Sequence, residues 1–348
     1  MSTEVKQTKP YGIGLDILRV MAMFFVIMVH STTFYGFYDE GVNSIGNFFA
    51  AFSRYLSYTC VPIFLLLTGY LNCHKTPTLR YYLKLIRFII EYVISGVIVF
   101  AFNKLFTESP MSFGNLISGL FNFTFPSYSW YVDMFIGLFL IAPFLNYILK
   151  ALTNKQKLIF VIVLIFAFSN FKISPWWSSA YPLIYYFIGA ILRDTKINIK
   201  KPILFVVASA TVLTQILLFK FPYIPRYSVE NYFNIGCIII AVSVFLLLYD
   251  IKIDEKKKVL ITPLRMIANT SLATYLVSEI FETLTAQYFE KIGAILYSDR
   301  LPYLLYLTPL KFILSVICGI LIHLAATYIF KIIQILIDKF AKKTQKTY

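Results

Sequence analysis

Long apolar runs, separated by short polar segments, fill almost the whole chain. A helix needs about 20 predominantly apolar residues to cross the hydrocarbon core of a bilayer. The runs therefore predict an all-α polytopic membrane protein that forms a single domain over residues 1–348. We predict about ten transmembrane helices, near 13–36, 47–73, 84–106, 129–149, 157–171, 180–193, 202–219, 232–250, 263–289 and 303–337. The fifth and sixth runs are short, and the ninth is only weakly apolar.

The basic residues between the runs predict how the helices are oriented. If the N-terminus is cytoplasmic, the inner segments hold about 23 Lys and Arg and the outer segments about seven, with Lys311 counted among the outer ones. Cytoplasmic loops carry such an excess of positive charge. We expect both termini in the cytoplasm, with a short N-terminal segment (1–12) and a basic tail (about 338–348), in a multi-pass protein of the inner (cytoplasmic) membrane.

Composition supports this interpretation and excludes other classes. The chain is 59% hydrophobic and only 14% charged, with a mean hydropathy of +0.72, so a soluble fold could not cover its apolar surface. The net charge of +15 would suit nucleic acid, but the charges stand in short clusters between apolar runs. We therefore assign them to membrane topology and lipid contacts, and expect no nucleic-acid partner.

Cysteines and tyrosines add two smaller expectations. The four cysteines have neither paired nor metal-ligand spacing, so we predict core residues, no disulfide framework and no metal site. Many of the 26 tyrosines stand near the ends of runs. They fit an interfacial aromatic belt, or else a surface that stacks against a sugar.

Three ionisable residues in the first apolar run are the main functional signal. Asp16 and Arg19 are spaced to pair on one face of a helix. Arg19 and His30 are eleven positions apart, which brings them back to the same side after about three turns, about 16 Å apart in depth. Charged groups in hydrocarbon are costly and mark functional sites. We infer a permanent cation near the cytoplasm for an anionic ligand, and a titratable imidazole deep in the membrane.

A basic cluster follows the second run. Residues 68–70, Thr-Gly-Tyr, predict a close approach between helices, because glycine lets backbones come together. Arg80, Lys84 and Arg87 then follow at spacings that place them on one helix face. They serve membrane topology and anionic lipid, or they clamp the phosphates of a cytosolic nucleotide-like donor.

The ninth run carries Glu279 and Glu282. Counted from the cytoplasmic start of the run near residue 263, Glu279 lies at nearly the same depth as His30. If the two helices are neighbours, Glu279 can orient the imidazole or share a proton with it. The alternative is an interfacial carboxylate near the outer surface. Asp133, at the outer start of the fourth run, is a weaker candidate for an orienting role.

These residues resemble the acyltransferase-3 family of integral-membrane O-acyltransferases. The family's first helix carries Asp-x-x-Arg and then a histidine eleven residues after the arginine, as Asp16, Arg19 and His30 do here. The segment 68–70 is similar to the family's Ser/Thr-Gly-Phe/Tyr element. Further resemblances are Lys84 with Arg87, SWYVDMFIGLFLIAPFLN from 129 to 146, and SLATYLVSEI from 271 to 280.

The resemblance extends over nearly the whole chain, with one departure. The late histidine common in the family is replaced by Ser278, followed by Glu279. Any role of that histidine therefore does not transfer. Relatives that act on surface polysaccharide share the serine-acid version, which favours a polysaccharide O-acetyltransferase-like protein.

The resemblance implies an acyl-CoA donor from the cytoplasm and an acceptor hydroxyl near the outer leaflet. Arg19, Arg80, Lys84 and Arg87 would bind the CoA phosphates. His30 would act as general base on a sugar hydroxyl or orient the thioester. The expected activity is O-acetyl transfer from acetyl-CoA, without a metal, to a cell-surface or capsular polysaccharide or its lipid-linked precursor. The alternative is a glycan exporter that transfers no acyl group.

Overall fold

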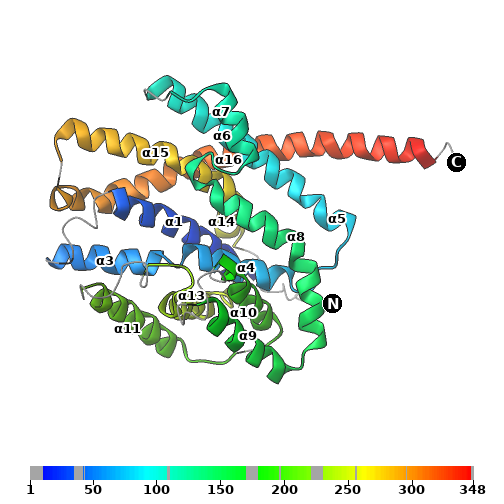
Figure 1. The fold of residues 1–348 in the computed structure, drawn as a ribbon, viewed down its shortest axis with the longest axis horizontal. Helices are drawn as coiled ribbons and strands as arrows, with labels where there is room; N and C mark the ends of the chain where they lie inside the picture. The colour runs from blue at the N-terminus through cyan, green and yellow to red at the C-terminus, as the bar shows by residue number, and fades with distance from the viewer. Residues whose placement is uncertain are drawn as a thin grey trace, which may run out of the picture.

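The computed structural model describes residues 11–34, 42, 44–107, 110–169, 179–195, 197–220, 230–254, 257–294 and 296–345. The described chain is helical almost throughout (Figure 1). Its helices are α1 (Gly14–Phe34), α3 (Ile45–Ser57), α4 (Cys60–Asn72), α5 (Leu79–Tyr82), α6 (Lys84–Phe106), α7 (Phe113–Phe121), η1 (Ser127–Ser129), α8 (Trp130–Ala151), α9 (Asn154–Phe168), α10 (Pro182–Asp194), α11 (Lys201–Lys220), α13 (Ile235–Leu248), α14 (Lys258–Asn269), α15 (Ser271–Ile292) and α16 (Tyr297–Gln345).

Six helical stretches of the described chain are long and apolar enough to cross a membrane, which makes this a multi-pass membrane protein. The other predicted runs fall on α9, α10, α13 and α15, which are shorter or more polar. The total of about ten spans therefore stays a prediction. The six stretches are Gly14–Thr33, Ile45–Asn72, Leu79–Phe106, Ser127–Ala151, Lys201–Phe219 and Asp299–Leu336.

Two of the predicted runs are interrupted in the structure. The second run divides into α3 and α4 around Tyr58 and Thr59, shortly before Pro62. Proline has no backbone N–H to donate, so it fits the first turn of a helix better than its middle. The ninth run divides at Thr270, between α14 and α15. Both interruptions lie beside the pocket described below.

Helices α4 and α10 pack at the distance of their backbones. A Cβ atom built on Gly69 would lie 2.0 Å from the carbonyl oxygen of Tyr186, and one on Gly189 would lie 2.1 Å from that of Leu66. A larger residue at either position would therefore overlap the backbone of the facing helix. The close approach predicted from residues 68–70 is confirmed.

A two-stranded antiparallel pairing, β1 (Tyr11–Gly12) with β2 (Lys252–Ile253), links the start of α1 to the segment after α13. Helix α16 runs past the rest of the bundle, and its end and the start of α1 lie toward the same end of the molecule (Figure 1). The cytoplasmic location of both termini stays a prediction. Residues 1–10 and 346–348 of the predicted terminal segments, and the predicted outer-loop residues Lys172 and Arg226, lie outside the described residues.

Candidate functional site

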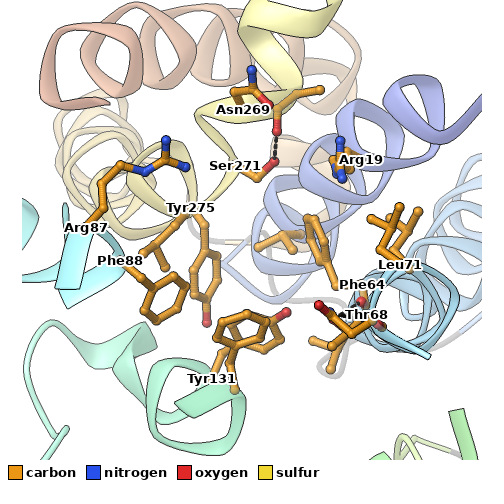
Figure 2. Close-up of a pocket in the computed structure, with 17 residues that line it drawn as sticks. Arg19, Phe64, Thr68, Leu71, Arg87, Phe88, Tyr131, Asn269, Ser271 and Tyr275 are labelled. Atoms are coloured by element: carbon orange, nitrogen blue, oxygen red, sulfur yellow. Dashed lines mark hydrogen bonds between the residues drawn. The ribbon is translucent and has the colours of Figure 1, made fainter. Parts of the chain in front are cut away.

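A pocket of about 300 Å³ lies between α1, α4, α6, α8 and the α14–α15 junction. Its polar end holds two guanidinium groups, from Arg19 and Arg87, which stand on opposite sides of the pocket with Asn269 and Ser271 between them (Figure 2). The opposite end is aromatic and includes Tyr131. The pocket thus joins a cationic entrance to an apolar interior.

Each guanidinium is held by a buried carboxylate on its own helix. Arg19 Nη1 lies 3.1 Å from Asp16 Oδ1, which confirms the predicted pair. Arg87 Nε lies 3.7 Å from Glu91 Oε1, one turn further along α6. The arginine side chains are 28% and 45% exposed, whereas both carboxylates are buried. Both cations therefore remain accessible to a ligand at the pocket entrance.

The structure separates the predicted basic cluster. Arg87 lines the pocket, but Arg80 and Lys84 are exposed and are not among its lining residues. Arg80 belongs to the short helix α5, which ends just before α6 begins at Lys84. Of the four residues predicted to bind CoA phosphates, the pocket brings together Arg19 and Arg87. Phosphate binding by any of the four stays a prediction.

His30 lies just beyond the pocket and not in its wall. The deepest pocket residue of α1 is Val26, and His30 follows one helical turn later, about 6 Å along the axis. The imidazole stacks on the ring of Tyr128, with ring centroids 4.1 Å apart. Neither of its ring nitrogens has a hydrogen-bond partner among the described residues.

Three tyrosines separate the pocket from His30, and we call them the aromatic layer: Tyr128, Tyr131 and Tyr275. Tyr131 and Tyr275 line the pocket and meet edge to face, with centroids 5.8 Å apart. Tyr275 also stacks on Tyr128, at 5.5 Å, and its hydroxyl donates to the Tyr128 carbonyl at 2.7 Å. Arg19 lines the pocket and His30 does not, and the aromatic layer connects the two.

Glu279 holds the segment that carries Tyr128. Its carboxylate accepts a hydrogen bond from the Ser127 backbone N–H at 2.8 Å and another from the Ser127 hydroxyl at 3.0 Å. The predicted direct contact with His30 is not what the structure shows. Within the described part of the chain, Glu279 is linked to the imidazole through Ser127 and the adjoining ring of Tyr128. Its catalytic role stays a prediction.

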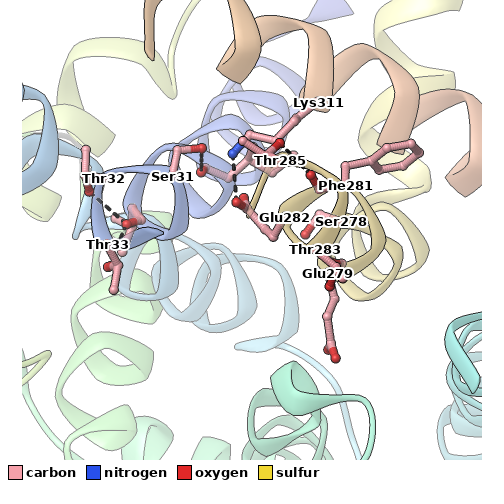
Figure 3. Close-up of polar contacts among 12 residues, drawn as sticks. Ser31, Thr32, Thr33, Ser278, Glu279, Phe281, Glu282, Thr283, Thr285 and Lys311 are labelled. Atoms are coloured by element: carbon pink, nitrogen blue, oxygen red, sulfur yellow. Dashed lines mark hydrogen bonds and ion pairs between the residues drawn. The ribbon is translucent and has the colours of Figure 1, made fainter. Parts of the chain in front are cut away.

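A second carboxylate of α15, Glu282, forms an ion pair that the sequence analysis missed. Glu282 Oε2 accepts from Lys311 Nζ on α16 at 2.7 Å, and both side chains are almost fully buried. Figure 3 shows the two reaching toward each other while Glu279 extends in another direction. Lys311 interacts electrostatically with His30. The assignment of Lys311 to an outer segment was wrong. Its position inside an apolar run could have indicated that it is buried in a helix.

Arg54, another cation inside an apolar run, is also buried and was given no role by the sequence analysis. It pairs with Glu230, with Nε 2.8 Å from Oε1. It also donates to the hydroxyls of Thr32 and Thr33 and to the carbonyl of Val29. Arg54 therefore fixes the end of α1 that carries His30, and it interacts electrostatically with that imidazole.

The remaining candidates are not among the residues that line the pocket. Asp133 is exposed on α8 and does not line the pocket. His323 Nδ1 on α16 lies 2.8 Å from Glu91, the residue that also faces Arg87. The four cysteines are free. One ligand atom from each of three residues, Cys73, His74 and Asp194, lies within 4.8 Å of the others at the ends of α4 and α10.

The fold and the pocket define a class of protein: a polytopic membrane protein whose helices enclose ion pairs and a cation-lined ligand pocket. The chain matches the family described as an acyltransferase domain over residues 13–331. It therefore belongs to the acyltransferase-3 family, as its motifs predicted, and is a membrane acyltransferase. Comparison with curated proteins and with solved structures gives no match.

Proposed function

We propose that this protein is an O-acetyltransferase of the cytoplasmic membrane. It moves an acetyl group from cytosolic acetyl-CoA to a hydroxyl of a cell-surface or capsular polysaccharide, or of its lipid-linked precursor. One observation carries the proposal: a pocket with two guanidinium groups at its entrance ends one helical turn short of a half-buried imidazole on α1.

The pocket suits the shape and charge of the donor. Guanidinium groups bind phosphate through short, charge-assisted hydrogen bonds, and Arg19 and Arg87 offer two of them at the entrance. A cavity of about 300 Å³ is small for a ligand site. It accepts the slender pantetheine arm, while the nucleotide remains outside. The thioester would then meet Tyr131 and Tyr275 at the inner end.

The proposed reaction needs a general base, and His30 supplies it. The acceptor oxygen attacks the thioester carbonyl carbon while His30 removes the proton of that hydroxyl. The tetrahedral intermediate then collapses, the C–S bond breaks, and the imidazolium returns the proton to the departing thiolate. The products are an acetyl ester and free CoA. The layer between pocket and imidazole must move aside for this step, and the transfer is thereby shielded from water.

The test compares variants in cells and in the purified protein. A deletion strain is complemented with wild-type protein, His30→Ala or Arg19→Ala, and the O-acetyl content of its surface glycan is measured by NMR. We expect His30→Ala to lose acetylation while the purified variant still binds acetyl-CoA in calorimetry. Arg19→Ala should weaken that binding about tenfold or more, the value of one charge-assisted contact.

The matched control is His74→Ala, because His74 is an exposed histidine just after the end of α4 and does not line the pocket. It should acetylate normally. Acetylation by His30→Ala at the wild-type level would refute the proposed mechanism. A glycan that lacks acetyl groups even with the wild-type protein would refute the proposed reaction.

A further inference from the structure

Two buried polar atoms on elements that pack around α1 have no partner within the described chain: the Tyr128 hydroxyl oxygen and Glu282 Oε1. The residues that carry them are 7% and 1% exposed. Buried polar groups in folded proteins are almost always hydrogen-bonded, so an orphan at a functional site calls for a missing partner. The donor pocket and the general base described above leave both atoms unused.

The two atoms belong to elements that surround α1, the helix of His30. The Tyr128 ring stacks on His30, and α15, the helix that carries Glu282, packs against both η1 and α1. Lys311, which is ion-paired with Glu282 Oε2, lies on α16, which packs against α1 as well as α15. Three different elements, η1, α15 and α16, therefore pack around α1. One half of the Glu282 carboxylate is satisfied by lysine, and the other half is open.

The chemistry of the two atoms specifies the partner. Glu282 Oε1 only accepts hydrogen bonds, whereas a tyrosine hydroxyl can donate one. An alcohol does both at one oxygen: it donates its proton to the carboxylate and accepts from the phenol. A carbonyl group cannot donate, and an ammonium group cannot accept. The pair thus selects a hydroxyl group.

We propose that Tyr128 Oη and Glu282 Oε1 form a subsite that holds a non-reacting hydroxyl of the acceptor sugar, beside the hydroxyl that His30 deprotonates, with Lys311 as the residue that positions Glu282. This inference rests on the proposed function and adds the location of the carbohydrate. The acceptor binds on the side of the aromatic layer away from the donor pocket. Tyr128 then contacts both the acceptor and the general base.

Tyr128→Phe tests the subsite without disturbing its packing. The variant keeps the stacked ring and removes only the unpartnered hydroxyl. The assay uses purified protein in nanodiscs, acetyl-CoA, and surface glycan isolated from the deletion strain. We expect the KM for glycan to rise tenfold or more, with the KM and calorimetric affinity for acetyl-CoA unchanged within twofold. The melting temperature without glycan should not fall, because no hydrogen bond is lost.

Two further variants complete the experiment. Glu282→Gln should also raise the KM for glycan, and the double variant Glu282→Gln/Lys311→Met covers the case in which an unpaired lysine prevents folding. Tyr186→Phe is the matched control, because that buried hydroxyl is already bonded to Asn146 and lies on α10. It should lower the melting temperature and leave both KM values unchanged.

The outcomes separate the two proposals. A folded Tyr128→Phe protein with the wild-type KM for glycan overturns the subsite, and the orphan atoms then hold a water molecule only. The proposed function would stand in that case, because acetyl transfer itself would be intact. A wild-type protein that neither binds acetyl-CoA nor acetylates the glycan overturns the proposed function, and the subsite with it.

Discussion

Asp16, Glu91 and Glu282 are buried carboxylates, and each faces a cation or an imidazole from the same or a neighbouring helix. A charge removed from water is costly unless it is paired, so each carboxylate fixes the place of its partner. Two of them stand behind the arginines of the pocket entrance. The third, Glu282, pairs with Lys311 of α16. The side chains proposed to bind the donor are therefore held in place by buried acids.

Arg87 and Lys84 give the sharpest test at this scale, because they are close on α6 and both were predicted to bind phosphate. Only Arg87 lines the pocket. Arg87→Ala should therefore weaken CoA binding about tenfold or more, as expected for the loss of a charge-assisted hydrogen bond. Lys84→Ala should change it less than twofold. Calorimetry with CoA distinguishes them, and equal losses would favour a diffuse basic surface over a built site.

Spacing along one helix predicted the Asp16–Arg19 pair, because both residues belong to the same two turns. The Lys311–Glu282 and Arg54–Glu230 pairs join residues 29 and 176 positions apart. The sequence shows that a lysine stands in an apolar run. Its partner depends on which helices become neighbours, which no local spacing encodes.

Interrupted helices shape the pocket. The α3–α4 and α14–α15 junctions place Val61 and Ser271 in its wall, where an uninterrupted helix would present a regular surface. Breaks of this kind are tolerated at membrane depth only where protein or a cavity covers the freed backbone groups. Both runs were predicted as continuous, because hydropathy averaged over a window does not register a break of one or two residues.

Gly69 shows how tightly two elements depend on one small residue. A methyl group there would meet the Tyr186 backbone at 2.0 Å, so Gly69→Ala must push α4 and α10 apart. We expect a fall in melting temperature of several degrees or loss of folded protein, measured by thermal unfolding in detergent. Gly137→Ala on α8 is the control, because its Cβ meets nothing within 4 Å. It should be neutral or stabilising, since alanine favours a helix by about 0.5–1 kcal/mol.

For the whole molecule, the charge bias predicts a single orientation in the membrane. In a cysteine-free background, a cysteine at Lys155 should react with a membrane-impermeant maleimide only after the cells are permeabilised. A cysteine in place of Lys291 should react in intact cells, because the charge bias places Lys291 in an outer segment. Labelling of both positions in intact cells would contradict the predicted orientation and place the pocket entrance on the wrong side for cytosolic CoA.

The sequence alone determined that the chain is an all-α membrane protein, which family it belongs to, and that Asp16, Arg19 and His30 share one helix. Length, hydropathy and short motifs can be read from the sequence locally. They determine the fold class because a segment that crosses lipid must be long, apolar and hydrogen-bonded within itself. The tertiary structure decided which cations reach the pocket, that Tyr128 and Tyr275 stand between it and His30, and that Glu282 faces Lys311. These contacts depend on helix packing, because buried side chains take their partners from whichever helix lies opposite.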